Sequence, residues 1–237
     1  MAVEQASHAQ IAPEDRFDYF WSQRGEWVEE PNVRRGGESG VQRIHAPGGQ
    51  LLYAKRQTGH IYRSWLHPFG RPTVLRELDA LTGLHKLNVR VPEIVFCGAQ
   101  RDPVHQWRAL LVTKSLDGFV EIEDWYASGG RERHGEAVHD RILKDLADNL
   151  ARMHKGRWQH SCLYIKHIFV RVTGEGPDAN VEVALLDLEK GRRRLTAQGA
   201  AQHDQARRAI DQRTDMPAFE EVAADNRDER QDQADQA

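Results

Sequence analysis

The chain has 237 residues, with 33 lysines and arginines against 36 aspartates and glutamates, and a formal net charge of −3. This balance argues against a protein that coats nucleic acid, because such proteins carry an excess of basic residues. The hydrophobic content is 39%, no apolar run approaches the roughly 20 residues that cross a bilayer, and the N-terminus lacks a signal-peptide pattern, so we expect a cytoplasmic protein.

The first part of the chain predicts a sheet with one inserted helix. A short helix is expected after Pro13, because proline suits a first helical turn. Residues 33–44 and 50–57 have the pattern of paired strands around a turn. Residues 67–73, rich in proline and glycine, are expected to form a loop.

A helix and two further strands follow. From Thr73 onward, apolar residues recur at spacings of three and four, which predicts an amphipathic helix. Residues 88–100 and 107–116 are expected to be strands. Pro92 confines the first of these to a sheet edge or to a late start, since proline cannot donate a ladder hydrogen bond.

The second part of the chain predicts helix, loop and hairpin in that order. Residues 141–155 carry an apolar stripe typical of a helix that packs on a core. A hairpin is expected around the turn at 174–180, and a helix pair or one interrupted helix over 194–212. The acidic residues 220–237 almost lack large apolar side chains, so we expect a disordered tail.

Several residues are candidates for binding a phosphorylated ligand. Gly36, Gly37 and Gly40 in the sequence GGESG would let backbone N–H groups approach phosphates, since glycine has no side chain to hold the ligand away. A plain surface turn is the alternative. Lys55 lies on an apolar strand, and Glu77 on the helix that follows would pair with it. The alternative for each is an ordinary surface charge.

Asp187 follows the apolar strand VALL, where a carboxylate is costly unless it binds a cation or a hydrogen-bond network. His160, Cys162 and His167 occupy the H, D and N positions of the kinase catalytic-loop pattern H-x-D-x-x-x-x-N. We therefore predict that Cys162 and His160 are catalytic, and that His167 and Asp187 bind a metal ion together. A capping or turn aspartate is the alternative for Asp187.

The segments YAKRQ, HPFGRPTVLREL, HSCLYIKHIF and LLDLEKGRRR resemble the lipopolysaccharide kinase (Kdo and heptose kinase) family, most closely its InaA-like branch. The resemblance implies an α+β protein with a two-lobed, protein-kinase-like fold: an antiparallel-sheet N-lobe over 1–116 and a mainly helical C-lobe over 117–219. It further implies an enzyme that uses ATP and Mg²⁺ to phosphorylate a sugar or glycolipid of the lipopolysaccharide core. We expect a monomer with peripheral contact at the cytoplasmic face of the inner membrane.

Cys162 departs from the family pattern, in which the better characterised core kinases have an aspartate base. Because a general base contributes typically 10² to 10⁴ in rate, the chain is expected to be either a slow kinase or a pseudokinase that binds without turnover. Other groups that would replace the base are Lys166 and Glu189. A zinc site made of His154, His160, Cys162 and His167 and a thiol-dependent hydrolase are the remaining alternatives.

Overall fold

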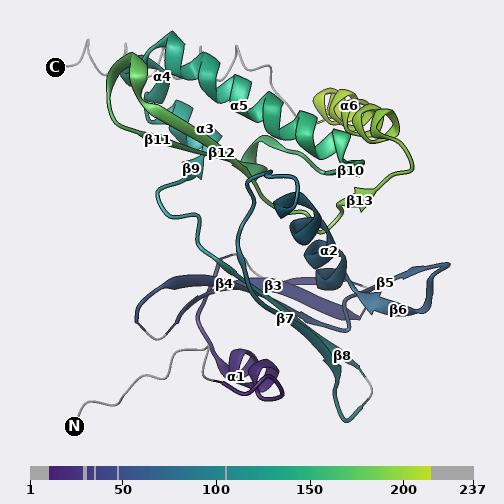
Figure 1. The fold of residues 1–237 in the computed structure, drawn as a ribbon. Coiled ribbons are helices and arrows are strands. Elements are labelled where there is room, and N and C mark those ends of the chain that lie inside the picture. Colours follow the sequence, from purple (N-terminus) through teal and green to yellow (C-terminus); the bar gives the residue numbers. More distant parts are fainter. Residues whose placement is uncertain (1–10, 29–30, 35, 47, 105, 215–237) are drawn as a thin grey trace, which may run out of the picture.

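The computed structural model describes residues 11–28, 31–34, 36–46, 48–104 and 106–214. The predicted disordered tail at 220–237 lies outside this range. The molecule has a sheet lobe and a mainly helical lobe, with α2 between them (Figure 1). In the described part of the chain, none of the helices combines the length and apolar character that a membrane span requires.

The sheet lobe is built on six antiparallel strands in the order β1-β3-β4-β8-β7, with β2 paired to β3. These strands are β1 (Glu26–Trp27), β2 (Asn32–Arg34), β3 (Gly37–His45), β4 (Leu51–Thr58), β7 (Ile94–Arg101) and β8 (Trp107–Lys114). The paired strands expected over residues 33–44 and 50–57 are confirmed. Strand β7 begins two residues after Pro92 and lies at the sheet edge, so both consequences of that proline are confirmed.

One helix packs on each face of this sheet (Figure 1). Helix α1 (Arg16–Ser22) covers one face with Phe17 and Phe20, and α2 (Thr73–His85) covers the other. Both helices are confirmed. Alternate residues of the central strands therefore contribute to two separate cores, as the period of two in a strand requires.

The loop predicted at residues 67–73 is wrong. Strand β6 (His67–Pro72) pairs with β5 (Ile61–Ser64) in a two-stranded hairpin that projects from the sheet lobe (Figure 1). Gly70 adopts a φ of 89°, and the two prolines are tolerated because a two-stranded ribbon leaves an unpaired edge on each strand. The prolines of this segment therefore lie in a two-stranded hairpin and not in a loop.

The helical lobe contains one long helix, α5, packed against a three-stranded sheet of β9, β11 and β12. Its elements are β9 (Val120–Glu121), α3 (Ile122–Ala127), α4 (Gly130–His134), α5 (Glu136–Lys155), β10 (Trp158–Gln159), β11 (Ile168–Thr173), β12 (Asn180–Leu185), β13 (Arg192–Arg193) and α6 (Ala197–Thr214). The predicted hairpin is confirmed, α5 begins five residues earlier than expected, and the C-terminal helix is single. The predicted lobe boundary at 116/117 falls in the segment that joins β8 to β9.

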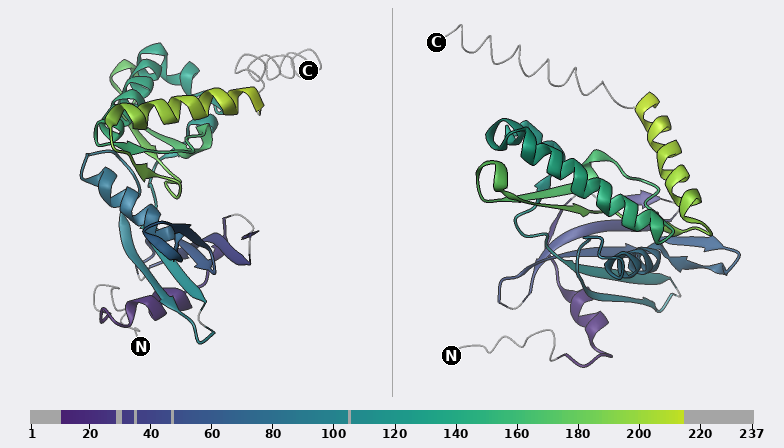
Figure 2. Two further views of the ribbon diagram at one scale, coloured as in Figure 1. Left: turned by 90° about the vertical axis from the view of Figure 1, so that its right-hand side faces the viewer. Right: turned by 45° about the horizontal axis from the view of Figure 1, so that its top comes forward.

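The larger hydrophobic core joins the two lobes. Buried residues of α2, including Leu81 and Leu84, share one cluster with Leu111 of the sheet and with Ile142 and Met153 of α5. Figure 2 shows α2 lying between the sheet and the helical lobe. At Gly83 this helix approaches the Trp158 indole so closely that an added Cβ would lie 2.5 Å from the ring. The position of α2 is therefore fixed by packing on both sides.

Candidate active site

The amine of Lys55 is surrounded by carboxylates from three segments. Its Nζ lies 2.8 Å from Glu77 Oε2, 2.7 Å from Glu189 Oε2 and 3.9 Å from Asp187 Oδ1. Strand β4 directs Lys55 to the face on which α2 packs, and Glu77 reaches it from that helix. Sequence positions 55, 77 and 187 are therefore brought together between the lobes.

The electrostatics of this cluster favour a charged lysine. Burial opposes the charge of Lys55, but Glu77, Glu189 and Asp187 outweigh it and raise the pKa of the amine above its usual value. Burial likewise opposes the charge of Glu189, and the nearby Lys55 lowers the pKa of that carboxyl. The side chains of Lys55 and Glu77 are only 16% and 11% exposed, so the pair is held away from most solvent.

Asp187 and His167 form the second part of the site. Asp187 Oδ2 lies 3.6 Å from His167 Nε2, and the Asp187 side chain is 45% exposed. Asp187 has a φ of 55°, in the left-handed region that aspartate adopts more readily than most residues. His167 Nδ1 donates to the carbonyl of Cys162 at 2.7 Å. With Nδ1 engaged in this hydrogen bond, Nε2 is the ring nitrogen that faces Asp187.

His160 does not have the exposure that a catalytic base needs. It is 0% exposed, and its Nε2 donates to the carbonyl of Leu186 at 2.8 Å. Burial lowers the pKa of this imidazole to about 4. The prediction that His160 acts directly on a substrate therefore does not fit the geometry: it is a buried imidazole that links the loop to the segment before Asp187.

Asp204 of α6 holds the same loop from the other side. Its carboxylate accepts hydrogen bonds from the backbone N–H groups of His160 and Ser161, each at 2.9 Å, and contacts His154 Nε2 at 3.0 Å. Burial opposes its charge, but these three donors together lower the pKa of the carboxyl. Ser161 has a φ of 70°, so this clamp holds the loop in a conformation that serine rarely adopts.

Cys162 lies at the position of the catalytic-loop aspartate and is 3% exposed. Lys190 donates to its Sγ at 3.2 Å. The thiol thus faces a cation supplied by the segment that follows Asp187. Neither Lys190 nor Asp204 was singled out from the sequence, because nothing in the local pattern of either residue indicates its distant partner.

The three predicted phosphate-binding glycines do not form one loop. Gly36 lies in the turn between β2 and β3, with a φ of 76° and open space around it. Gly37 and Gly40 lie within β3, and an added Cβ would collide with the backbone of Gly59 or with the ring of Trp27, respectively. These two glycines are required for packing within the lobe, and their assignment to a phosphate loop stays a prediction. Gly36 keeps the geometry of the prediction.

The zinc alternative lacks the geometry of a metal centre. Among the described residues, the cluster in which three potential ligand atoms lie within 4.8 Å of one another is made of Glu136, His139 and Asp140. It contains none of the four residues that the sequence suggested. Glu136 is also already paired with Arg131 through two contacts of 2.8 Å.

Three comparisons with known proteins found relatives of this chain. The model of the lipopolysaccharide kinase (Kdo/WaaP) family matches residues 18–217. Protein InaA of Escherichia coli (strain K12) is 44% identical over 190 residues, which cover 80% of this chain and 85% of InaA. A solved structure described as WaaP in complex with acyl carrier protein has a TM-score of 0.59 at 19% identity, covering 82% of this chain and 76% of WaaP. The last likeness confirms the two-lobed, kinase-like α+β fold.

Proposed function

Because the chain belongs to the lipopolysaccharide kinase (Kdo/WaaP) family, we propose that it transfers a phosphoryl group from ATP, with Mg²⁺, to a sugar hydroxyl of the lipopolysaccharide inner core. The family itself supports a sugar kinase. The use of ATP and Mg²⁺, the acceptor and the roles of individual residues are our proposal.

The observation that carries this proposal is the engaged pair of Lys55 and Glu77, 2.8 Å apart, beside the partly exposed carboxylate of Asp187. Kinases need this pair to hold the nucleotide phosphates. Lys55 would contact phosphate oxygens, while Glu77 and Glu189 keep its amine charged and oriented. Gly36, in the turn between β2 and β3, would bring backbone N–H groups to the same phosphates.

The donor set fits a divalent cation. Asp187 offers carboxylate oxygens, the ligands that Mg²⁺ prefers, and His167 offers a nitrogen whose lone pair is freed by the Nδ1–H bond to Cys162. These two residues would hold the metal ion. When bound, Mg²⁺ would neutralise charge on the nucleotide phosphates.

The acceptor hydroxyl would bind near the loop around Cys162. A phosphoryl transfer through a loose transition state depends mainly on positioning and charge neutralisation, so loss of the aspartate base leaves a slow enzyme. Lys190, 3.2 Å from the thiol, would supply positive charge toward the transferred group. His160 and Asp204 would position this loop without touching the substrate.

A pseudokinase is the second candidate, and the burial of Cys162 favours it. The thiol is 3% exposed and offers no carboxylate at the position where the kinase pattern has its base. Such a protein would bind ATP and Mg²⁺ and would be stabilised by them, since any ligand that binds only the folded state raises its stability. It would show no turnover.

Both candidates are tested with the full chain, labelled ATP, Mg²⁺ and inner-core oligosaccharide or whole-envelope extract. We expect label on the saccharide with the natural chain and none with Asp187→Ala. Asp187→Asn serves as a second variant, because asparagine tolerates the left-handed backbone at this position. A nucleotide-dependent thermal shift without label on any acceptor would favour the pseudokinase, and turnover by both variants would refute the assignment of Asp187.

We also propose a place of action. An acceptor in the lipopolysaccharide core is attached to a lipid, so the enzyme would work at the cytoplasmic face of the inner membrane. Peripheral binding to that surface would bring the site to its acceptor.

A further inference from the structure

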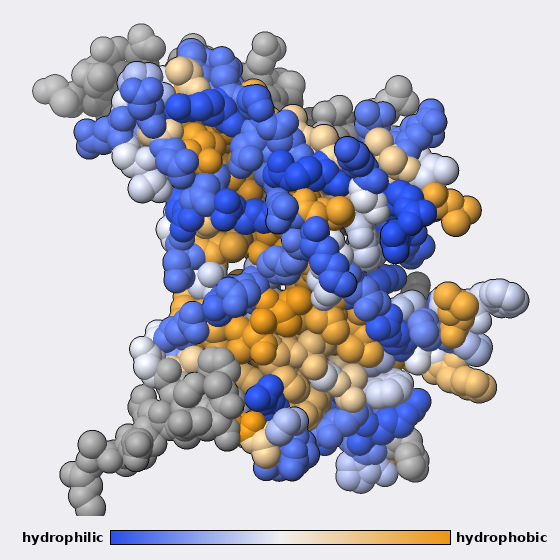
Figure 3. Space-filling view, viewed as in Figure 1, coloured by the Kyte–Doolittle hydropathy of each residue, from blue (hydrophilic) through white to orange (hydrophobic). Residues whose placement is uncertain are grey.

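The tip of the β5–β6 hairpin exposes three large apolar side chains within five residues. Trp65 is 96% exposed, Leu66 79% and Phe69 86%. Single exposed apolar residues are common on soluble proteins, but a contiguous group on a projecting element indicates an interaction site. Figure 3 shows apolar residues, in orange, at the right-hand edge of the molecule, over the hairpin.

A second apolar group projects on the same side. Leu195, in the segment that joins β13 to α6, is 92% exposed. In Figure 3 a separate apolar group stands above the hairpin tip, near this segment. The residues just before it, Arg192, Arg193 and Arg194, are all exposed, so an apolar projection is joined to a basic stretch.

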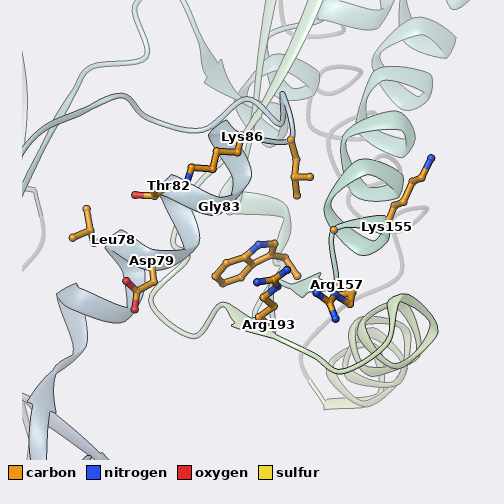
Figure 4. A pocket seen from close by; sticks show the side chains of 11 residues that line it. Leu78, Asp79, Thr82, Gly83, Lys86, Lys155, Arg157 and Arg193 are labelled. Atoms are coloured by element: carbon orange, nitrogen blue, oxygen red, sulfur yellow. The ribbon is translucent and has the colours of Figure 1, made fainter. Parts of the chain in front are cut away.

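A basic hollow of about 720 Å³ lies between α2 and the C-terminal end of α5 (Figure 4). Lys86, Lys155, Arg157 and Arg193 line it from three segments, and the side chain of Lys155 points away from it in Figure 4. The indole of Trp158 forms part of its floor. Asp79 is the one acid among the described lining residues, and Arg71 of β6 already pairs with it at 2.7 Å. The hollow therefore presents a surplus of positive charge.

These features fit one kind of partner. Tryptophan and phenylalanine favour the interface of a bilayer, where an aromatic ring meets both apolar chains and polar headgroups. Lysine and arginine near the same plane are attracted to anionic lipids, and arginine binds phosphate with two parallel hydrogen bonds. A surface with apolar tips around a basic centre is complementary to an anionic membrane, because the tips match its apolar interior and the basic centre matches its negative headgroups.

We propose that this side of the molecule docks on an anionic lipid bilayer. Trp65, Leu66, Phe69 and Leu195 enter the interface, and the hollow lined by Lys86 and Arg193 receives a lipid phosphate. The inference deepens the proposed function, because its biological purpose rests on a lipid-linked acceptor. The binding itself is independent of catalysis.

The test is flotation of the full chain with vesicles of phosphatidylethanolamine and phosphatidylglycerol, compared with vesicles of phosphatidylcholine. We expect the anionic vesicles to carry at least ten times more protein. Raising the salt concentration from about 0.05 M to about 0.5 M should weaken binding, because salt screens exposed charges.

Two variants locate the contact, each with a matched control. Trp65→Ser combined with Leu66→Ser and Phe69→Ser should reduce vesicle binding at least tenfold, while Val104→Ser, which changes an apolar residue that is 78% exposed on another hairpin, should not. Arg193→Glu should reduce binding at least threefold. Arg133→Glu is its control, because α4 lies at the opposite end of the molecule in Figure 1.

The result that would overturn the proposal is equal binding to neutral and anionic vesicles, or full binding by the hairpin variant. A tip that joins two copies of the chain would also overturn it, and would be seen as a concentration-dependent dimer that the hairpin variant abolishes. Affinity for ATP and Mg²⁺, measured on the same proteins without vesicles, should stay unchanged in every variant. If the natural chain binds vesicles but does not bind ATP and Mg²⁺, the proposed function is contradicted and the membrane proposal stands.

Discussion

The candidate site has two halves: the proposed nucleotide half, made of Lys55, Glu77 and Asp187, and the proposed acceptor half, which is the loop around Cys162. The two halves differ in how far they follow the kinase pattern. The nucleotide half has its lysine, its helix glutamate and its aspartate, with Lys55 and Glu77 already in contact at 2.8 Å. The acceptor half has a buried thiol where the base belongs, and Lys190 contacts it. The difference shows that the lysine–glutamate pair can form without an aspartate at position 162.

The acceptor half is nevertheless held firmly. Asp204 accepts two backbone hydrogen bonds from the loop, and His160 donates to the backbone beside Asp187. A buried charge is costly unless it is fully paired, and here three donors pair with Asp204. The loop is therefore held in one conformation.

Lys55→Met is expected to give the largest effect, because it removes the centre of the nucleotide half. ATP turnover should fall about 10²- to 10³-fold, the typical loss on removing one group that stabilises transition-state charge. The measurement is steady-state release of labelled phosphate. Lys114→Met is the control, since that lysine lies at one end of the β4–β8 pairing and forms an ion pair with Glu93. Turnover that survives the change at Lys55 would remove the basis of the comparison.

Asp204→Ala tests the support of the acceptor half. It leaves the N–H groups of His160 and Ser161 buried without an acceptor, at a cost of about 1 to 3 kcal/mol each. We expect the free energy of unfolding to fall by about 3 kcal/mol in urea titrations. Asp148→Ala, which breaks an exposed pair with Lys144, should cost less than about 1 kcal/mol. Equal losses in both variants would mean that Asp204 does not clamp the loop.

The pH dependence of stability tests His160. Because burial lowers its folded pKa from 6.5 to about 4, the unfolded chain binds more protons between these values. The stability contributed by the neutral imidazole is therefore present above pH 6.5 and is lost as the pH falls toward 4, by at most about 3 kcal/mol.

His160→Gln should flatten this part of the profile, as measured by urea unfolding at several pH values. His45→Gln, at an exposed position of β3, should keep the profile of the natural chain. If the two variants behave alike, the acid sensitivity arises from another group.

Cys162→Asp is expected to have the smallest effect, a rise of about tenfold in turnover. The new carboxylate would restore the base, which is worth 10² to 10⁴ in full alignment, but the pairing with Lys190 would lower its basicity. Cys162→Ala is the control and should leave the slow rate unchanged. A strong loss in both variants would make the thiol a participant in the reaction.

The order of elements was sufficient to predict the nucleotide half. A lysine on a strand followed by a glutamate on the next helix meets wherever that helix packs on the sheet, so Lys55 and Glu77 could be paired from the sequence. The convergence of His167 with Asp187 follows in the same way, because the hairpin of β11 and β12 returns the chain to its starting point.

The supporting contacts could not be predicted in this way. Asp204 lies 44 positions from His160, on a helix whose sequence carries no catalytic pattern, and only the packing of α6 brings them together. The short elements α3, α4, β10 and β13 could not be predicted, because segments of two to six residues are too short to show a periodic hydrophobic pattern. The sequence alone does not separate the two possible reasons for a glycine, since close packing and phosphate approach both demand the absence of a side chain.

Gly83 brings the helix that carries Glu77 into close contact with the Trp158 indole, where no larger side chain fits without a shift. Many kinases are switched on and off by moving that helix, which makes or breaks its ion pair with the strand lysine. Here the Trp158 indole packs directly against the helix at Gly83, and the Lys55–Glu77 ion pair is already formed. If the chain is a kinase as proposed, a change in the position of this helix would not be needed to form the ion pair.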